Sequence, residues 1–442
     1  MPPHITIIGS GFSGTLTAIH LLSQTTTPLT ISLIDPRGSF GPGLAYSPPS
    51  KTFTLNVKAK AMGALPSDGE GFFRWLKKKR PSTSPNEFAP RSYYGEYLCE
   101  LLNLVETSSR IHTVNRVPQE VIDLERTPNN VFSVTLSDGS ILYADACVLA
   151  LGNIPRCSLG KTLDMSAFHP PYSAESYSHI TGAKEALIIG SSLTAVDVIL
   201  ESERNGFRGE YTVISRHGRF PLPHEESRAE HQFQIASESL TLGSVTKLCA
   251  IMRSESRRLH SSQPVFDHIR PHIQTVWKHL PEKEKQRFLR HLQPIWDIHR
   301  HRIPVQHHET LQELQRTKRL RLTAGRFHDA KKTNAGCTAT YTSRGARSET
   351  ITKFFDVAFL CVGPEGDLTK MKSPLIRNLL RRGLITPGTL RLGIVHSAPK
   401  LAVVGPLQRE LLWEITAVRE LREEAQLQAA AILQSLGAPL AG

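Results

Sequence analysis

Three glycines near the amino terminus are spaced so that the backbone can closely approach a phosphate group. Gly9, Gly11 and Gly14 stand in the pattern G-x-G-x-x-G, and Asp35 follows about 20 residues further on. The first glycine permits a tight turn, the second lets the backbone approach a diphosphate, and the third lets a helix pack closely on a strand. A carboxylate at the position of Asp35 accepts hydrogen bonds from a ribose. The pattern therefore predicts dinucleotide binding, with a purely structural glycine-rich turn as the alternative.

A second turn of similar outline begins at Gly190, where the sequence reads GSSLTA. It keeps the first glycine but places Ser192 and Ala195 at the other two positions. A serine there either crowds a diphosphate or donates a hydrogen bond to it. About 20 residues later a strand ends in Arg216 and His217 instead of an acid. Because a cation at this place accommodates a 2′-phosphate, we expect NADP(H) rather than NAD(H) here. A solvated basic turn is the alternative.

Other side chains show no pattern for metal binding or nucleophilic catalysis. The 6 cysteines contain no C-x-x-C pair, so neither a disulfide framework, a zinc site nor a dithiol redox centre is indicated. Residues 299–302 read HRHR, which lacks a histidine pair spaced i, i+4. With 19 histidines in the chain, a structural or surface role is the first interpretation of each. The histidines placed to relay a proton are His217, His224, His299 and His301.

These residues require two strand–turn–helix units to position them. Residues 4–9 are typical of a short β-branched strand, residues 15–22 of a buried helix, and residues 29–35 of a second strand. Residues 185–200 repeat the strand and helix. The segments 144–153 and 355–364 are each a buried strand that ends in a glycine turn. The first precedes the second glycine motif and the other follows it, which indicates that one unit is inserted in the other.

The predicted fold class is therefore α/β, with two Rossmann-like βαβ dinucleotide-binding domains and the second inserted in the first. We expect the first domain to comprise residues 1–155 and 331–442, and the second to comprise residues 156–330. A helical subdomain rich in histidine and arginine is expected at about 224–320. It is either a solvated basic face or a surface that meets an anionic substrate or cofactor. Residues 421–436 are typical of an amphipathic carboxyl-terminal helix.

Composition narrows the class of protein. The chain of 442 residues is 39% hydrophobic and 21% charged, and no apolar run approaches the ~20 residues that cross a bilayer. The first strand begins so early that no secretion signal is expected, and a cytoplasmic location follows. The formal net charge of +13 attracts phosphates, carboxylates or nucleic acid. Nucleic acid is disfavoured as a partner because aromatic residues do not alternate with the basic ones and no basic run exceeds KKKR.

Taken together, the motifs resemble the two-dinucleotide flavoproteins over nearly the whole chain. The similarity is greatest to an FAD/NAD(P)-binding family that is distantly similar to NADPH-dependent N-hydroxylating flavin monooxygenases. The segments that carry the resemblance are GSGFSG (9–14), GPGLAY (41–46), TLNVKAKAMGAL (54–65), FAPRSYYGEYL (88–98), LALGN (149–153), GSSLTAVD (190–197), SRHG (215–218), WDIHRHR (296–302) and VVGPLQRELLWEITAVRELR (403–422).

The resemblance implies FAD at the first turn and NADPH at the second. It places Asn56 near the flavin ring, and Arg91 and Tyr94 beside the FAD diphosphate and isoalloxazine. The turn at Gly405 and a helix start after it would approach the flavin pyrimidine edge, where backbone N–H groups stabilise negative charge. Trp413 is either a flavin contact or a core aromatic. The candidate cofactor-binding residues are Gly9, Gly11, Phe12, Ser13, Gly14, Asp35, Pro36, Arg37, Tyr46, Asn56, Arg91, Tyr94, Gly152, Gly190, Ser192, Leu193, Thr194, Arg216, Gly405, Pro406 and Trp413.

The implied activity is that of an FAD/NADPH-dependent oxidoreductase. By the resemblance it is a monooxygenase that forms a flavin C4a-hydroperoxide from molecular oxygen and oxygenates a small amine or sulfur nucleophile, which we expect to be anionic. Because the flavin carries the chemistry, no catalytic side chain is assigned, and Asn56, Arg91 and His217 are only candidates. One alternative is a flavin oxidoreductase without oxygen insertion. Another is a nucleotide-bound protein that interacts with a polyanion.

Overall fold

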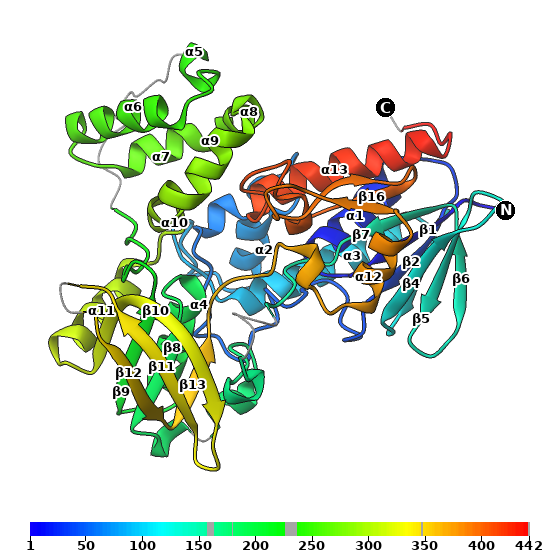
Figure 1. The fold of residues 1–442 in the computed structure, drawn as a ribbon. Helices are drawn as coiled ribbons and strands as arrows, with labels where there is room; N and C mark the ends of the chain where they lie inside the picture. The colour runs from blue at the N-terminus through cyan, green and yellow to red at the C-terminus, as the bar shows by residue number, and fades with distance from the viewer. Residues whose placement is uncertain (157–162, 179, 226–236, 346–347, 441–442) are drawn as a thin grey trace. The chain divides into compact units, whose positions relative to one another are not determined.

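The computed structural model describes the chain except for residues 157–162, 179, 226–236, 346–347 and 441–442, and it divides into two compact units (Figure 1). Unit 1 consists of Met1–Pro155 and Pro364–Gly442, and unit 2 of Arg156–Gly363. The second glycine turn therefore lies in a unit inserted within the first. No helix in the described part of the chain is long and apolar enough to cross a membrane.

Unit 1 is built on a parallel five-stranded sheet in the order β16-β7-β1-β2-β3. The strands are β1 (His4–Ile8), β2 (Thr30–Ile34), β3 (Thr113–Val117), β7 (Ala146–Leu149) and β16 (Leu401–Val403). Strand β16 pairs with β7 from beyond the inserted unit. Parallel sheets are buried on both faces, and all of β1 after its first residue is buried.

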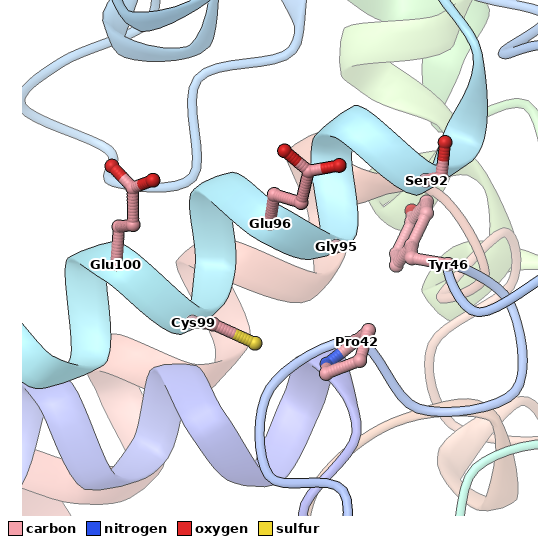
Figure 2. A pocket seen from close by; sticks show the side chains of 7 residues that line it. All are labelled: Pro42, Tyr46, Ser92, Gly95, Glu96, Cys99 and Glu100. Atoms are coloured by element: carbon pink, nitrogen blue, oxygen red, sulfur yellow. The ribbon is translucent and has the colours of Figure 1, made fainter.

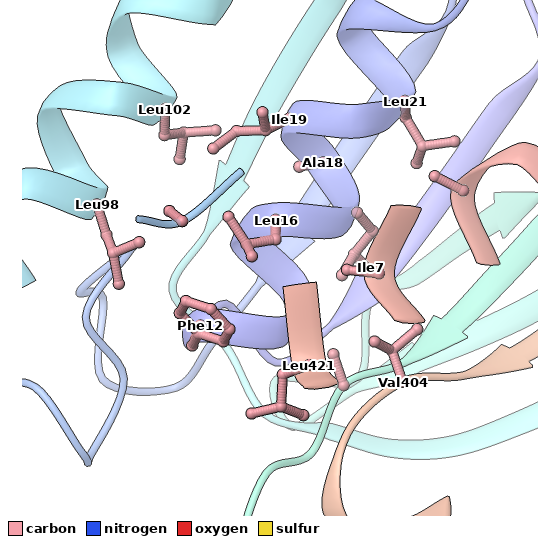
Figure 3. Packing of buried hydrophobic residues seen from close by; sticks show 14 of the residues in the cluster. Ile7, Phe12, Leu16, Ala18, Ile19, Leu21, Leu98, Leu102, Val404 and Leu421 are labelled. Carbon is pink, nitrogen blue, oxygen red and sulfur yellow. The ribbon is translucent and has the colours of Figure 1, made fainter. Parts of the chain in front are cut away.

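Helices cover one face of this sheet. They are α1 (Phe12–Ser23), α2 (Gly71–Lys79), α3 (Arg91–Ser108) and α13 (Val418–Ser435). Figure 3 shows Leu98 and Leu102 of α3 near Leu16 and Ile19 of α1, while Leu421 approaches from α13. The predicted helix 421–436 corresponds to α13, and the predicted helix 15–22 begins earlier, at Phe12, because Gly11 is its N-cap.

Shorter elements cover the opposite face of the same sheet. They are the antiparallel strands β4 (Val121–Arg126), β5 (Phe132–Leu136) and β6 (Ile141–Ala144), the helix α12 (Pro374–Arg381), and the hairpin β14 (Ile385–Pro387) and β15 (Ile394–Ser397). Ile8 packs in this second core while its neighbour Ile7 packs in the first. This alternation follows from the two-residue period of a strand.

Unit 2 contains a six-stranded sheet in the order β12-β11-β10-β9-β8-β13. Its strands are β8 (Glu185–Ile189), β9 (Glu210–Ser215), β10 (Leu320–Lys332), β11 (Cys337–Ser343), β12 (Thr350–Phe355) and β13 (Val357–Leu360), and α4 (Leu193–Arg204) follows β8. We expected the chain to return to the first domain at residue 331, but in the structure unit 2 extends to Gly363. Strands β11 and β12 extend β10 as an antiparallel meander, and β13 pairs with β8.

The segment between β9 and β10 is helical in its described part, as expected for about 224–320, although residues 226–236 lie outside the described residues. Its helices are α5 (Ser237–Leu240), α6 (Val245–Arg258), α7 (Gln263–Ile269), α8 (Ile273–His279), α9 (Glu282–Arg287), α10 (Gln293–Arg300) and α11 (Val305–Arg316). Leu222 exchanges backbone hydrogen bonds with residues 298 and 303 at 3.0 Å each, which ties α10 to the end of β9. Single turns occur at η1 (Ala59–Ala61), η2 (Met165–Ala167), η3 (Ala174–Tyr177), η4 (Ile180–Gly182), η5 (Arg270–His272), η6 (Phe288–Leu292), η7 (Leu368–Lys370) and η8 (Pro406–Gln408).

Candidate functional site

The glycine turn between β1 and α1 leaves no space for side chains at its first and third positions. Gly9 has φ +97°, and a Cβ there would lie 2.3 Å from the carbonyl oxygen of Ala150. A Cβ at Gly14 would lie 1.9 Å from the carbonyl oxygen of Gly9. The N–H of Gly9 donates to Ile34 O at 2.8 Å, which holds the turn against the neighbouring strand. Both glycines are therefore required by close backbone contacts.

The middle glycine of the turn faces a second glycine-rich loop. A Cβ at Gly43 would lie 2.7 Å from Cα of Gly11, and Gly43 has φ +57°. Gly11 is the N-cap of α1, no side chain caps the helix, and its first turn has no acidic residue. A helix start with open N–H groups and no nearby carboxylate binds anions. The residues at this turn therefore fit the diphosphate of a dinucleotide.

Asp35 lies at the end of β2 and is 2% exposed. Its Oδ2 accepts the N–H of Ser10 at 3.1 Å and Arg37 Nη2 at 3.0 Å, and its Oδ1 accepts the backbone N–H and the Nε of Arg37, each at 3.1 Å. Burial alone raises the pKa of Asp35, but the hydrogen bonds from Arg37 and Ser10 outweigh it and lower the pKa. The group is thus an anion ready to accept ribose hydroxyls. Arg37 is exposed together with Pro36.

The turn at Gly405 lies beside the start of α1. Gly405 has φ +110°, and a Cβ there would lie 3.0 Å from Oγ of Ser13. The expected helix start after it is only the single turn η8, which begins at Pro406, and α13 begins at Val418. Trp413 is 1% exposed and the Arg409 guanidinium lies 4.6 Å from its ring centroid, which is the arrangement of a core aromatic. Backbone groups at 405–406, rather than a helix, therefore face this part of the site.

Two segments pair to bring Asn56 and Arg91 into one region. Thr54 bridges Pro90, and the Arg91 Nε donates to Thr54 O at 3.0 Å. The half-buried Asn56 is two residues from this bridge. Arg91 lies close enough to Tyr46 to oppose the effect of burial, which raises the pKa of Tyr46 to about 12.

Aromatic residues pack behind the first turn. The ring centroid of Tyr46 lies 6.1 Å from Phe12 and 4.6 Å from Tyr94. Tyr94 is fully buried, and its hydroxyl has no hydrogen-bond partner among the described residues. Of the predicted residues, Phe12, Tyr46 and Tyr94 therefore form one cluster. Gly152, in contrast, has φ +64° and open space where its Cβ would be.

A pocket of about 370 Å³ lies between α3 and the loop 42–46 (Figure 2). Its lining residues are Pro42, Tyr46, Ser92, Gly95, Glu96, Cys99 and Glu100. Figure 2 shows the Glu96 and Glu100 carboxylates on the same side of α3, with the Cys99 thiol directed toward Pro42. The Glu100 carboxylate forms an ion pair with Lys79 at 2.8 Å and accepts a hydrogen bond from Trp75 at 2.7 Å. The lining residues include no cation, so this pocket offers a diphosphate no charged partner.

The second glycine turn repeats the geometry of the first. Gly190 has φ +102°, and a Cβ there would lie 2.1 Å from the carbonyl oxygen of Cys361. Its N–H donates to Ile214 O at 2.8 Å. Ser192 is the exposed N-cap of α4 with φ −89° and ψ −164°, close to the −71° and −167° of Gly11, and its side chain makes no capping bond. Leu193 and Thr194 form the first turn, which has no acidic residue. These residues also fit a diphosphate.

A group of basic residues follows β9 beside this turn. Arg216 and His217 are exposed, as are Arg219 and Arg344. Partial burial and then Arg216, Arg344 and Arg219 lower the pKa of His217. The segments that carry these arginines meet at Ala324, which accepts the N–H of Arg344 at 2.7 Å and lies against Gly218. The basic run RHGR hints at Arg219, whereas no sequence signal indicates Arg344, which follows β11.

The other candidate histidines lie in the helical segment of unit 2 or beside it. The His299 ring stacks on Phe266 with centroids 4.7 Å apart, and its Nδ1 lies 2.9 Å from Oγ of Ser262. The backbone N–H of His224 donates to Ile303 O at 2.9 Å, and His301 Nε2 lies 4.0 Å from an Asp297 oxygen. Within the described ranges, no group of His, Cys, Asp and Glu could hold a metal ion.

Comparisons with known proteins bear on the first glycine turn and on the fold of the whole chain. Residues 6–154 match a family model described as FAD-NAD(P)-binding. L-lysine 6-monooxygenase from Pseudomonas syringae is 13% identical with a TM-score of 0.65, over 99% of this chain and 100% of that one. Ornithine N-hydroxylase from Kutzneria sp. 744, in a complex with FADred, NADP+ and L-orn, is 13% identical with a TM-score of 0.63 over 99% of both chains. Bacillithiol disulfide reductase from Staphylococcus aureus is 15% identical with a TM-score of 0.55, over 98% of this chain and 99% of that one.

Curated protein sequences give no match to this chain. At such low identities the structural similarities establish the fold, and the family model matches only the first part of the chain. The predicted α/β fold with two dinucleotide-binding domains is confirmed. Residues 6–154 thus match a model of the FAD-NAD(P)-binding family, within a chain that has the fold of the two-dinucleotide flavoproteins.

Proposed function

We propose that this protein is an FAD-dependent, NADPH-utilising monooxygenase that oxygenates a small amine or sulfur nucleophile. The observation that carries the proposal is the matched pair of turns at Gly9 and Gly190, each held at the end of a parallel strand with an open helix start behind it. One dinucleotide site binds a single cofactor, whereas two sites allow electrons to pass from one nucleotide to the other. The similarity to the lysine and ornithine enzymes supports oxygenation as the outcome.

In this proposal FAD binds at the first turn and NADPH at the second. The N–H groups at the start of α1 bind the FAD diphosphate, and Asp35 accepts hydrogen bonds from its ribose. Backbone groups at Gly405 and Pro406 face the pyrimidine edge of the flavin, while Asn56 and Arg91 lie near its ring. The bound flavin would supply the redox chemistry by accepting hydride from NADPH and activating oxygen.

The substrate is proposed to be a small amine that also carries an anionic group. The amines in the names of the similar structures are lysine and ornithine, both amino acids. In this chain Arg300 and Arg302 are each 8% exposed in the helical segment of unit 2. Arg302 already forms an ion pair with Asp267 in the same segment, so the case for an anionic group rests on the two amino acids named above.

The alternative function is flavin oxidoreduction without oxygen insertion. The similarity to bacillithiol disulfide reductase favours it. However, the sequence contains no C-x-x-C pair, and the cysteines in the described part of the chain are free thiols. A dithiol mechanism is therefore disfavoured.

Purified protein tests the proposal directly. We expect a yellow protein that NADPH bleaches faster than NADH does. In air, one of L-ornithine, L-lysine or cadaverine, offered as amine probes, should stimulate NADPH consumption and yield a hydroxylated product. Turnover without oxygen, using an organic acceptor and giving no oxygenated product, would support the alternative instead.

A pair of glycine variants links this activity to the first turn. A Cβ at Gly11 would lie 3.3 Å from Cα of Gly43, whereas a Cβ at Gly69 has no atom within 4 Å. We expect Gly11→Ala to weaken FAD retention at least about tenfold because it crowds the diphosphate approach. Gly69→Ala, the matched control in the same unit, should stay yellow. Equal FAD content in both variants would contradict the assignment of the site.

A further inference from the structure

Three exposed arginines of unit 2 converge although they come from two distant parts of the chain. Arg216 and Arg219 follow β9, while Arg344 follows β11. Both segments are fixed on Ala324 of β10. A Cβ at Gly218 would lie 2.8 Å from Ala324 N, and the N–H of Arg344 donates to Ala324 O at 2.7 Å. The meander β10–β12 therefore positions Arg344 near the carboxyl end of β9.

The same arginines are tied to the second glycine turn. The Ser191 hydroxyl donates to Arg219 O at 2.6 Å and lies 2.9 Å from Oγ of Ser215. That Ser215 oxygen accepts the N–H of Gly218 at 3.0 Å. Since Ser191 directly follows Gly190, the backbone of the basic turn is fixed beside the proposed diphosphate site. The carboxyl end of β9 is where the ribose of a dinucleotide lies in such a unit.

None of these three guanidiniums forms an ion pair with a described residue. Arginine at the other end of β9 behaves differently, because Arg319 and Arg208 both pair with Glu203, at 2.7 and 3.9 Å. Unpaired like charges at close range repel each other, and a bound anion relieves that repulsion. Burial and then the three arginines lower the pKa of His217.

We propose that Arg219 and Arg344 act with Arg216 as the receptor for the 2′-phosphate of NADPH, and that Arg344 makes a large contribution to the preference for NADPH over NADH. The inference rests on the proposed function, since it assumes NADPH at the second turn. A phosphomonoester carries nearly two negative charges and three acceptor oxygens, which matches three guanidinium donors better than a single carboxylate does.

Direct binding to the FAD-loaded full-length protein tests this assignment without relying on turnover. The probes are 2′,5′-ADP and 5′-ADP, titrated by calorimetry. We expect Arg344→Ala and Arg219→Ala each to weaken 2′,5′-ADP binding about 10- to 100-fold, because each removes a charge-assisted contact, and to leave 5′-ADP affinity within about twofold. Retained 5′-ADP binding also shows that the variants are folded.

The matched control is Arg208→Ala, which removes the same charge at the opposite end of β9 and should leave both affinities unchanged. Arg344→Lys should give an intermediate loss because it keeps the charge but not the planar donor geometry. If Arg344→Ala changes neither affinity, or lowers both equally, the inference is wrong while NADPH binding stands. If the unaltered protein binds neither probe, the proposed function fails as well.

Discussion

At the scale of single residues, His20 of α1 makes unit 1 sensitive to acid. It is 6% exposed, and its Nε2 has no hydrogen-bond partner among the described residues. Burial lowers the pKa of His20 from 6.5 to about 4. Below pH 6.5 the His20 side chain therefore binds a proton in the unfolded chain but not in the folded unit. The free energy of unfolding consequently falls as the pH falls toward 4.

We expect the protonation of this histidine in the unfolded chain to lower the free energy of unfolding by about 2 kcal/mol as the pH is lowered from about 7 to about 5. His20→Leu should lose that part of the pH dependence, as measured by urea unfolding at both pH values. His396→Leu is the control because that histidine is exposed in the same unit. A pH dependence of His20→Leu as steep as that of the unaltered protein would show that other groups cause the loss.

Residue chemistry that depends on close backbone contacts can be predicted from the sequence. Gly9 and Gly190 were recognisable because a positive φ and an adjacent carbonyl allow almost no other residue type. Arg216 could be predicted because it stands directly after the second strand of a βαβ unit, a position that is fixed by the motif. Arg344 could not, because it reaches the site only through the pairing of β11 with β10.

At the scale of elements, Glu410 joins the hairpin β14–β15 to the turn that carries Gly405. Its two carboxylate oxygens accept the N–H groups of Leu390 at 3.0 Å and Leu392 at 3.1 Å, and it is 7% exposed. We expect Glu410→Ala to lower the unfolding free energy by about 3 kcal/mol, because both amides lose a charged acceptor.

Glu410→Gln should cost less, since its amide oxygen can still accept one of the two N–H groups. Chemical unfolding monitored by tryptophan fluorescence measures both variants, with the exposed Glu120→Ala as the control. A Glu410→Ala protein as stable as the control would show that the hairpin is held by its apolar contacts alone.

The elements themselves were predictable where their pattern is local. The strand and the helix on either side of each glycine turn are predicted by short runs of apolar residues that end at a glycine. The boundary expected at residue 331 differs from the division of the structure, in which unit 2 extends to Gly363, because a buried strand carries no sign of which sheet it joins. Residues 144–153 and 355–364 each supply a strand that pairs in parallel with the first strand of its unit, β7 with β1 and β13 with β8. Only pairing along the whole strand distinguishes them.

At the scale of the whole molecule, two compact units with separate cores should not unfold in one all-or-none transition. Unit 1 packs around residues such as Ile7 and Leu16, and unit 2 around residues such as Leu187 and Phe355. A ligand that binds only one folded unit stabilises that unit by about 2.7 kcal/mol at a free concentration of about 100 times its Kd.

For a unit of this size that stabilisation raises the midpoint by roughly 5–10 °C. We therefore expect calorimetry of the apoprotein to show two transitions, with FAD raising one and 2′,5′-ADP raising the other. Gly11→Ala should reduce only the FAD shift, by about half or more, and Arg344→Ala should reduce only the shift caused by 2′,5′-ADP. A single transition that moves equally with either ligand would mean that both nucleotides stabilise one cooperative unit, and the assignment of one dinucleotide to each glycine turn would lose its thermodynamic basis.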